Sequence, residues 1–434
     1  MKIVQTGNVY LDFVLNVMLF ILFTYPILGA FMWFIGVVCY RFLFRYQKKG
    51  FKEIPADKQP YITIMVPAHN EETVIEKTLH YLLHEINYYD YEVLVIDDGS
   101  TDDTAKILAD LVTKEERLRV ITIEKNKGKA HAFDIGFAFA KGEYILSNDA
   151  DTIPEPDALI KYINYFMTSE DDNIGAVTGN MDVLNRSKII EKAQTVEFSS
   201  IVGVIKRSQQ GTLNTMYAFS GANTMYRKTA LLDAGLFRQD RATEDISIAW
   251  DEQLLGWVPV FAPDIMFYMM VPDTLPMLYR QRKRWAKGGT EVWLTNFPKI
   301  VLHPIKHFNQ LIMFIDQTLS ILWSLFFWLS SLIFLLTLMH FLVTKNYERI
   351  FHMFAMAFIF VNFQMVAGFL QLGAALFIDD RGKKLRYLIF APFYMLLYWM
   401  MNALTILTTL IPAIKTILGH GSGTWVSPER RPNK

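Results

Sequence analysis

Acidic residues gather at three places along the sequence, and a basic and aromatic group follows them. The acidic groups are Asp97-Asp98-Gly99-Ser100-Thr101-Asp102, the pair Asp149 and Asp151, and Thr243-Glu244-Asp245. The last group is Gln281-Arg282-Lys283-Arg284-Trp285. Carboxylates accept hydrogen bonds from hydroxyl and amide groups, and they bind hard divalent cations. This combination suits a substrate that carries phosphate and hydroxyl groups.

The pair Asp149 and Asp151 is the candidate metal site. If the substrate carries a diphosphate, its negative charge would repel these carboxylates unless a cation lay between them. Mg²⁺ and Mn²⁺ suit this position because they take oxygen ligands. The simpler alternative is a pair of loop acids that bind nothing. The other acidic groups in the same chain favour the metal.

Apolar runs alternate with helical patterns in the region that must position these side chains. Strands are predicted at residues 62–66, 92–96, 119–123, 144–147 and 176–179. Helices are predicted at residues 72–84, 103–114, 129–140 and 156–167. The alternation predicts an α/β, Rossmann-like domain with a largely parallel sheet. Ligands of such sheets bind at the carboxyl ends of the strands, where the first two acidic groups lie.

Composition indicates a soluble domain combined with a membrane region. The chain has 434 residues, of which 52% are hydrophobic and 20% are charged, and its mean hydropathy is +0.20. Basic and acidic residues number 43 each, so the net charge offers no argument for a nucleic-acid partner. Cys39 is the only cysteine, which excludes a disulfide framework and is compatible with the cytosol.

The first hydrophobic block covers residues 13–44 and is interrupted by Tyr25-Pro26. Its length predicts one kinked or tilted transmembrane helix, because one span needs about 20 apolar residues. A cleaved signal peptide fits poorly, since the basic residues Arg45, Lys48 and Lys49 follow the block. These residues place the following domain in the cytoplasm by the positive-inside rule.

Three further spans are predicted at residues 318–343, 351–378 and 387–414. The basic connection at residues 379–386 agrees with a cytoplasmic loop. Four spans would place the C-terminus outside, whereas the basic tail favours the inside, so the side of the C-terminus stays open. Residues 274–315 fit amphipathic helices on the membrane surface and core helices of the soluble domain equally well.

These patterns predict four parts: a transmembrane segment at residues 1–50, a cytosolic domain at 51–309, transmembrane helices at 310–418 and a tail at 419–434. No Gly-x-Gly-x-x-Gly after a strand, no Walker loop and no His-Glu-x-x-His is present in the sequence. Dinucleotide binding, P-loop chemistry and this type of zinc hydrolysis are therefore not supported.

The short motifs together resemble the processive family 2 glycosyltransferases of GT-A fold. They are Val66-Pro67-Ala68-His69-Asn70-Glu71-Glu72, the run from Asp97, the Asp149 pair, the Thr243 triplet and the Gln-x-x-Arg-Trp motif from Gln281. Longer stretches resemble the bacterial poly-β-1,6-N-acetyl-D-glucosamine synthases, over nearly the whole chain. Among them are Gly175-Ala176-Val177-Thr178-Gly179-Asn180, Ile205-Lys206-Arg207-Ser208-Gln209 and Trp425-Val426-Ser427-Pro428-Glu429-Arg430.

The resemblance implies synthesis of a biofilm exopolysaccharide from UDP-N-acetylglucosamine at the inner face of the plasma membrane. The growing polysaccharide would pass outward through the bilayer, and a small membrane accessory subunit is the expected partner. Hyaluronan, chitin and cellulose synthases share the short motifs and remain alternatives. A nonprocessive enzyme acting on polyprenyl phosphate would share only the donor motifs, and a transporter or scaffold would not need the acids.

The resemblance also implies roles for residues on the donor side. It assigns Asp98 to the uridine, because a carboxylate suits uracil N–H or ribose hydroxyl donors. Pro67, Asn70 and Glu71 belong to the same substrate-binding pocket. Lys129 corresponds to a lysine near the nucleotide end of the donor, although Lys125, Lys127 and Lys129 also fit a solvated loop.

On the transfer side, the resemblance assigns Asp149 to the ribose and the metal, and Asp151 to the cation. Asp245 corresponds to the catalytic base, and Glu244 lies in the substrate site. Inversion requires such a base to take the acceptor hydroxyl proton. The same acids also suit the first turn of a helix, and the two roles are compatible.

In the Gln281 motif, Arg284 suits the diphosphate and Trp285 offers a flat face to an acceptor sugar. Gln281 belongs to the same substrate site. Arg282 and Lys283 are expected on a basic face at the membrane edge. Asp102 is expected to cap the next helix. The stretch Ser220-Gly221-Ala222-Asn223-Thr224 resembles an acceptor-pocket loop in its position only.

Overall fold

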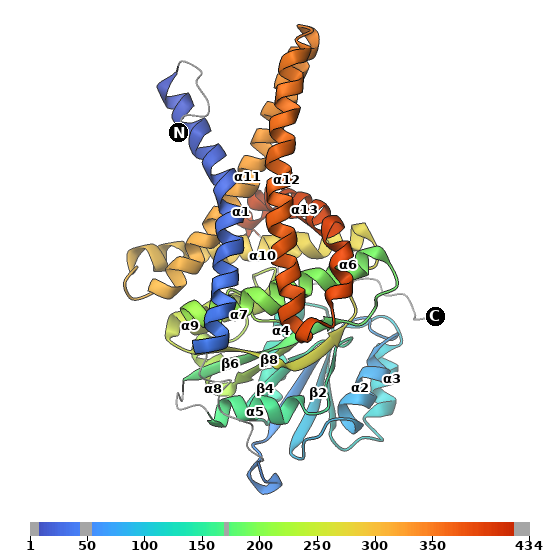
Figure 1. Cartoon of the computed structure of the whole chain (residues 1–434). Coiled ribbons are helices and arrows are strands. Elements are labelled where there is room, and N and C mark those ends of the chain that lie inside the picture. The colour runs from blue at the N-terminus through green and yellow to red at the C-terminus, as the bar shows by residue number, and fades with distance from the viewer. Residues whose placement is uncertain (1–7, 44–53, 169–172, 421–434) are drawn as a thin grey trace.

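The structure is a computed structural model that describes residues 8–43, 54–168 and 173–420. Long helices rise from one side of an α/β domain (Figure 1). The basic residues Arg45, Lys48 and Lys49 and the tail motif from Trp425 lie outside the described residues. The predicted division into four parts stays a prediction at its boundaries.

One eight-stranded sheet forms the centre of the domain, in the order β3-β2-β1-β4-β7-β6-β8-β5. The strands are β1 (Ile62–Ala68), β2 (Tyr91–Asp98), β3 (Leu118–Ile123), β4 (Tyr144–Asn148), β5 (Ile153–Pro154), β6 (Ile174–Val183), β7 (Asn223–Arg227) and β8 (Val258–Met269). All five predicted strands are confirmed. The sequence analysis did not predict β5, β7 or β8.

The sheet is mixed, so the prediction of a largely parallel sheet holds for only one half. Strands β3, β2, β1 and β4 are parallel neighbours. β7 runs antiparallel to both β4 and β6, while β6 and β8 are parallel. The carboxyl ends of β1, β2 and β4 therefore meet at one edge, which is where open α/β sheets bind ligands.

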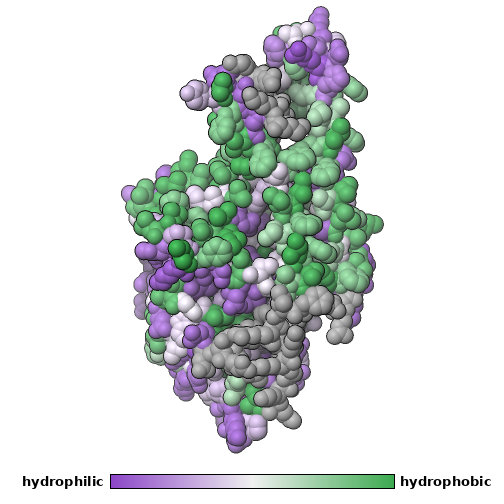
Figure 2. All heavy atoms as spheres, turned by 60° about the vertical axis from the view of Figure 1, so that its left-hand side comes forward, coloured by the Kyte–Doolittle hydropathy of each residue, from purple (hydrophilic) through white to green (hydrophobic). Residues whose placement is uncertain are grey.

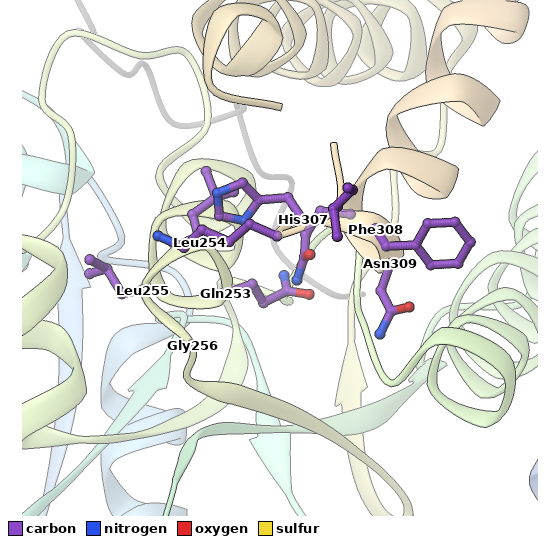
Figure 3. A pocket seen from close by; sticks show the side chains of 10 residues that line it. Gln253, Leu254, Leu255, Gly256, His307, Phe308 and Asn309 are labelled. Carbon is purple, nitrogen blue, oxygen red and sulfur yellow. The ribbon is translucent and has the colours of Figure 1, made fainter. Parts of the chain in front are cut away.

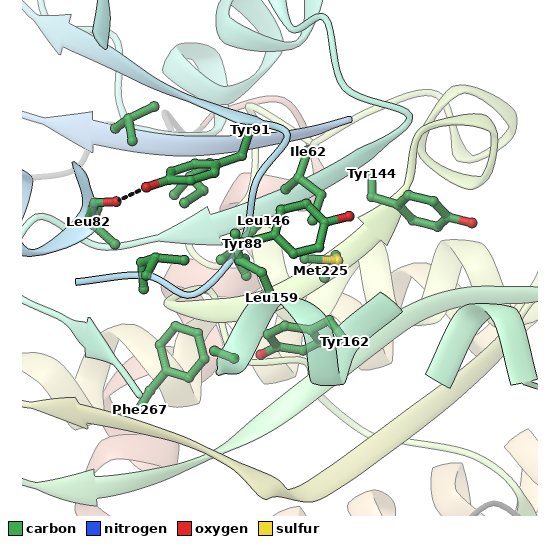
Figure 4. Close-up of a cluster of buried hydrophobic side chains, with 14 of the residues drawn as sticks. Ile62, Leu82, Tyr88, Tyr91, Tyr144, Leu146, Leu159, Tyr162, Met225 and Phe267 are labelled. Carbon is green, nitrogen blue, oxygen red and sulfur yellow. Dashed lines mark hydrogen bonds between the residues drawn. The ribbon is translucent and has the colours of Figure 1, made fainter. Parts of the chain in front are cut away.

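Helices cover both faces of the sheet (Figure 1). They include α2 (Ile75–His84), α3 (Thr104–Leu111), α4 (Lys129–Phe139), α5 (Ala158–Thr168) and α8 (Lys228–Ala234), and the four predicted helices are confirmed among them. Central strands are buried on both faces, which explains their continuous apolar runs. Figure 4 shows one apolar cluster, in which the Tyr91 hydroxyl donates to the Leu82 carbonyl at 2.8 Å. Burying each large apolar side chain contributes about 1.5–3 kcal/mol.

A second group of helices lies between the sheet and the long apolar helices. α6 (Ile189–Phe198), a π-helix (Ser199–Ile205) and α7 (Lys206–Leu213) form one continuous run. α9 (Glu244–Leu255) and α10 (Leu275–Leu302) follow β7 and precede the membrane region. Short 3₁₀ helices cover Ala56–Lys58, Asp379–Gly382 and Leu385–Phe390.

Four helices are long and apolar enough to cross a membrane among the described residues. They are α1 (Val9–Leu43), α11 (Phe308–Val343), α12 (Tyr347–Ile378) and α13 (Ala391–Ile417). The first is one helix with Pro26 inside it, as predicted. Figure 2 shows hydrophobic residues gathered over this part of the molecule, and side chains of α12 such as Phe358 and Leu370 are exposed. These surfaces are suited to lipid.

Residues 274–315, for which two interpretations stayed open, contain α10 and the start of α11. Val292 and Ile300 of α10 are buried together with Trp250 of α9 and Met313 of α11. Leu302 and Ile305 are exposed. One face of this segment is thus buried in a core, as expected for core helices of the soluble domain.

α1 lies directly against α7 of the α/β domain. A Cβ atom at Gly36 would overlap Ser208 Oγ, and one at Gly211 would lie 2.6 Å from the Tyr40 nitrogen. The Tyr40 hydroxyl donates to the Phe261 carbonyl of β8 at 3.2 Å. The two glycines therefore permit a backbone approach that fixes the first apolar helix on the domain.

Candidate active site

The loops that follow β1 and β2 are bound to each other where the predicted donor site lies. Asn70 has a φ of 58°, and its side-chain oxygen accepts from the Thr101 amide at 2.8 Å. The Asn70 amide donates to Ser100 Oγ at 3.0 Å. His69 Nδ1 lies 2.8 Å from the Asp98 carbonyl oxygen. Pro67 is buried in β1.

Asp98 is buried at the end of β2 and faces the loop before α4. Its carboxylate accepts from the Gly128 amide at 2.8 Å and from the Lys127 amide at 3.1 Å. Gly128 has a φ of 100°, a conformation that favours glycine. Asp98 therefore holds the loop that leads to Lys129.

Neighbouring acids have structural partners as well. Glu71 is buried, and its amide donates to Thr104 Oγ1 at 2.9 Å. Asp102 accepts from the Thr104 amide at 3.0 Å, at the first residue of α3. The N-cap of α3 is Asp103, so Asp102 is not the capping residue as expected; it lies one residue earlier and, within the helix, accepts only from the first amide.

Lys129 lies at the centre of the transfer half of the site. Its Nζ is 2.6 Å from Asp149 Oδ1, 3.1 Å from Glu244 Oε1 and 3.1 Å from the Gly221 carbonyl oxygen. The side chain is 8% exposed, which excludes the solvated-loop alternative for this lysine. Burial alone would lower the pKa of Lys129, but Asp149 and Glu244 raise it, so the ammonium stays charged.

Glu244 and Asp245 begin α9, and their pKa values are shifted in opposite directions. Burial, and next the charge of Glu244, raise the pKa of Asp245 to about 6. Burial would also raise the pKa of Glu244, but Lys129 and Arg284 hold it below its usual value. Neighbouring carboxylates with separated pKa values are a pattern that active sites use to divide acid and base roles.

Asp245 is held by backbone amides and keeps part of its surface exposed. Its Oδ2 accepts from the Gly221 amide at 3.1 Å, and its Oδ1 accepts from the Ile246 amide at 2.9 Å. Part of the residue remains accessible, unlike the buried Glu244. A substrate hydroxyl can therefore approach Asp245.

Asp149 and Asp151 follow β4 at the same edge of the sheet. The Asp149 side chain is 33% exposed, and Asp151 Oδ1 accepts from Thr152 Oγ1 at 3.2 Å. Over residues 8–43, 54–168 and 173–420, no group of three His, Cys, Asp or Glu side chains could hold a metal ion. The described protein thus offers at most two carboxylates here. Such a set fits a cation that takes its other oxygen ligands from phosphates and water.

The Gln281 motif lies on α10, and one expectation about it is wrong. Arg282 was expected on a basic membrane-edge face, yet it is buried and donates to Glu197 Oε2 at 2.7 Å. Its guanidinium carbon lies 3.9 Å from the centroid of the Trp285 ring. The reason is the buried Glu197 of α6, which offers a carboxylate that no local pattern reveals. Lys283 is exposed, as expected.

Gln281, Arg284 and Trp285 are half-buried on the same helix. Arg284 is close enough to lower the pKa of both Glu244 and Asp245 by its charge. Trp285 packs against the apolar cluster on one face of the sheet. The structure thus brings Arg284 to the acids of α9.

Two residues that interact with the candidate base were given no role in the sequence analysis. The backbone of Gly221 contacts both Lys129 and Asp245, although only the position of its loop had been noted. Lys206 is buried at the start of α7, and burial lowers its pKa to about 8 although the charge of Asp245 opposes this. A lysine directly after the apolar run Ile201-Val202-Gly203-Val204-Ile205 was the available signal.

A cavity of about 460 Å³ lies elsewhere, between the end of α9 and the α10–α11 connection. Figure 3 shows Gln253, His307 and Phe308 at its walls. None of the predicted site residues lines it. The cavity is therefore separate from the candidate active site.

The comparisons with known proteins agree with this geometry. Residues 63–234 match the family described as Glycosyl transferase family 2. This match and the sheet define the class of protein as a glycosyltransferase of family 2 with a GT-A fold.

Relatives with similar sequences cover nearly the full chain. The poly-beta-1,6-N-acetyl-D-glucosamine synthase of Staphylococcus epidermidis is 34% identical over 96% of this chain and 99% of its own length. The enzyme of the same name from Staphylococcus aureus is 36% identical over 95% of this chain and 98% of its own length. The chain therefore belongs to the family of poly-β-1,6-N-acetyl-D-glucosamine synthases.

A solved structure supports the fold. It is the mannosyltransferase PcManGT from Pyrobaculum calidifontis in complex with GDP-Man and Mn²⁺, with a TM-score of 0.55 and 19% identity. The likeness covers 91% of this chain and 99% of that chain. It extends through the long helices as well as the sheet domain.

Proposed function

We propose that this protein is an inverting, processive N-acetylglucosaminyltransferase that polymerises N-acetylglucosamine from UDP-N-acetylglucosamine into a β-1,6-linked exopolysaccharide. Near full-length similarity to synthases with this name supports the product. The chemical step rests on one observation, the partly exposed Asp245 with its raised pKa beside the charged Lys129 and Glu244.

In the proposed reaction, Asp245 accepts the proton of the acceptor hydroxyl. The hydroxyl oxygen forms a bond to the anomeric carbon of the donor, while the bond from that carbon to the phosphate oxygen breaks on the opposite face. UDP leaves with the electron pair, and the proton remains on Asp245 until solvent removes it. A base with a pKa of about 6 is suited to this transfer near neutral pH.

The donor half would bind the nucleotide with side chains already ordered by neighbouring loops. Asp98 and Asn70 are the proposed uridine contacts, with Pro67 and Glu71 forming the wall of this pocket. In the transfer half, Lys129 would attract the donor phosphates from the same side as Asp149 and stabilise the charge that develops on them. Arg284 would bind the diphosphate, and Gln281 and Trp285 would contact the acceptor.

Asp149 and Asp151 are the proposed ligands of Mg²⁺ or Mn²⁺. Two carboxylates suit a hard cation that completes its coordination with donor phosphates. When bound, the cation neutralises charge on the departing UDP. Lys129 would then adjust its contact with Asp149, because both positive charges compete for the same carboxylate.

The apolar helices would hold the enzyme in the plasma membrane with its catalytic domain in the cytoplasm. They would also provide the path for the polymer, because a polar chain at membrane depth needs protein walls. A small accessory subunit is the expected membrane partner.

The side of the membrane on which the catalytic domain lies can be tested by cysteine labelling. Cys39→Ser would provide a cysteine-free chain. Lys127→Cys, in the catalytic domain, and Lys345→Cys, between α11 and α12, would then show which side of the membrane each position occupies, by their reaction with a membrane-impermeant thiol reagent. Labelling of Lys127→Cys in intact cells would contradict the cytoplasmic location.

The decisive assay uses membranes that contain the full chain, labelled UDP-N-acetylglucosamine and Mg²⁺. We expect a long polymer that a β-1,6-specific hexosaminidase degrades, and no polymer from Asp245→Asn. Asp240→Asn removes an exposed acid five residues earlier and is the matched control, expected to retain activity. A resistant polymer would instead indicate a hyaluronan-, chitin- or cellulose-like synthase, and a single-sugar lipid would indicate a nonprocessive enzyme.

A further inference from the structure

The connection between α12 and α13 returns to the catalytic sheet through a buried carboxylate. Asp379, the residue after α12, is 1% exposed. Its oxygens accept from Lys384 Nζ at 2.8 Å, Ser199 Oγ at 3.0 Å and Asn180 Nδ2 at 3.0 Å. The Arg207 guanidinium lies 3.6 Å away. These partners, together with Asp182, are called the Asp379 cluster below, and they join β6, the π-helix, α7 and the connection.

Within the Asp379 cluster, the charges of Asp379 and Lys384 stabilise each other although both residues are buried. Burial would raise the pKa of Asp379, but Lys384 and Arg207 hold it below its usual value. Burial would lower the pKa of Lys384, but Asp379 and then Asp182 raise it. Lys384 Nζ lies 3.1 Å from Asp182 Oδ1, and Arg186 also bonds to Asp182. Removing one member of such a group leaves an uncompensated buried charge, so the connection has one strongly preferred position.

The π-helix is shaped around this cluster. Turns of this kind are rare and often lie at functional sites. A Cβ atom at Gly203 would lie 3.0 Å from Arg207 Nη1 and 3.4 Å from the Asp379 carboxyl carbon. Arg207 also donates to the Gly203 carbonyl. The irregular backbone thus leaves room for the charged groups.

From the cluster, hydrogen bonds continue to the candidate base. The backbone carbonyl of Asn180 accepts from Asn223 Nδ2 at 3.1 Å. The backbone amide of Asn223 closes the turn that contains Gly221. The backbone amide of Gly221 in turn donates to Asp245 Oδ2 at 3.1 Å. The buried residues Asn180 and Asn223 therefore link Asp379 to the loop that holds Asp245.

We propose that Asp379 is a positioning residue for glycosyl transfer, because its carboxylate seats the α12–α13 connection on β6 and thereby keeps the Gly221 amide directed at Asp245. This inference rests on the proposed role of Asp245 as the base. Efficient transfer then requires that the helices expected to receive the polymer are seated on the catalytic domain. A contiguous set of buried hydrogen bonds and the short backbone segments between them carry this coupling.

The test uses Asp379→Asn in the full membrane-embedded chain. We expect kcat to fall by about tenfold or more, while the Kd for UDP and the KM for UDP-N-acetylglucosamine change by less than about twofold. Because Asp245 would lose the Gly221 donor, the acidic limb of the kcat profile should also move to higher pH.

Glu92→Gln is the matched control. Glu92 is a buried carboxylate with three partners, Thr63 Oγ1 at 2.8 Å, Arg119 Nη1 at 2.8 Å and the Lys141 amide at 3.0 Å. It lies at the start of β2, away from the carboxyl ends of the strands. We expect a lower thermal midpoint and a kcat within about twofold of wild type.

A second variant tests the link itself and serves if Asp379→Asn does not fold. Asn180→Ala keeps every charge of the cluster but removes the amide that bonds to Asp379. It should lower kcat in the same way, and adding Asp379→Asn should then cost less than the two single effects combined. Additive losses, or a parallel loss of UDP binding and kcat, would overturn the proposal.

The outcomes also separate this inference from the proposed function. If Asp245→Asn still makes polymer, the base assignment fails and the positioning role fails with it. If Asp245→Asn is inactive and Asp379→Asn resembles Glu92→Gln, only the positioning role is overturned.

Discussion

The donor half and the transfer half of the candidate site are built from different interactions. Around Asp98 and Asn70, short loops are tied together by side-chain bonds to backbone amides. Around Lys129, Glu244 and Asp245, charged side chains from α4 and α9 meet in a mostly buried space. Hydrogen bonds to backbone amides hold the first half in place, whereas the second half depends on the mutual compensation of buried charges.

This difference teaches which quantity each half controls. Ordered hydrogen-bonding groups reduce the entropy lost when a nucleotide binds, so they affect affinity. Buried charges set which carboxylate is protonated and how developing charge is stabilised, so they affect rate. Variants of the donor half should therefore change KM, and variants of the transfer half should change kcat.

After the loss of polymer expected for Asp245→Asn, the largest effect is expected for Lys129→Met. The change leaves Asp149 and Glu244 without their shared ammonium, and an uncompensated buried charge costs about 3–5 kcal/mol. We expect kcat to fall by about 10²-fold or more, measured as labelled polymer per minute at saturating donor. Lys127→Met is the control, since that exposed lysine contributes its backbone amide to Asp98. If Lys129→Met changed only the affinity for UDP and left kcat unchanged, the assignment of kcat to the transfer half would be wrong.

A smaller effect is expected for Asp98→Ala. The carboxylate accepts from the Lys127 and Gly128 amides, and hydrogen bonds to a charged group contribute about 1.5–3 kcal/mol. UDP should bind about 10- to 100-fold more weakly in calorimetry, while kcat at saturating donor changes less. An unchanged Kd would show that Asp98 only supports the loop.

The pH dependence should follow Asp245. Since its pKa is raised to about 6, the proton-accepting form is lost as pH falls through that value. kcat/KM, which reports the ionisation of the free enzyme, should therefore drop about tenfold for each pH unit below about 6. Stability responds with the opposite sign, because a raised carboxyl pKa means that the folded state binds the proton more tightly. This group makes folding more favourable as pH falls from about 6 towards its ordinary value. A flat kcat/KM profile between roughly pH 5 and 7 would argue against Asp245 as the base.

The smallest effect is expected for Asn70→Gly. Glycine tolerates the φ of 58° but removes the side-chain acceptor for Thr101, a loss of about 1 kcal/mol or fivefold in KM. Asn70→Ala adds backbone strain of about 1–2 kcal/mol and should be worse. Equal KM values for Asn70→Gly and Asn70→Ala would show that the backbone conformation of residue 70 does not contribute to the effect.

The sequence predicted the parallel half of the sheet because its strands are continuous apolar runs. β8 was missed, since Pro259 and Pro263 interrupt its pattern and prolines argue against a central strand. β7 has only five residues and is antiparallel to both neighbours. Short strands of this kind are fixed by their partners more than by their own sequence.

Local motifs were sufficient to place the acids, but not to find their partners. Asp149 and Asp245 follow recognisable patterns, whereas the contact of Lys129 with the Gly221 carbonyl joins residues that are 92 positions apart. Arg282 was misjudged for the same reason, because its partner Glu197 lies on another helix. Long-range charge pairs of this type have no signature within a short window.

The close approach of Gly36 to Ser208 has a consequence for biosynthesis. Chains generally fold from the N-terminus while they are being made, so α1 would occupy the membrane before α7 leaves the ribosome. The catalytic domain would then complete its packing on a helix that is already in the bilayer. In this order of folding, the catalytic domain packs on α1 first, and α11, α12 and α13 pack on the domain afterwards. Nascent chains stopped after α10 should therefore resist proteolysis in membranes, and rapid digestion would contradict this order.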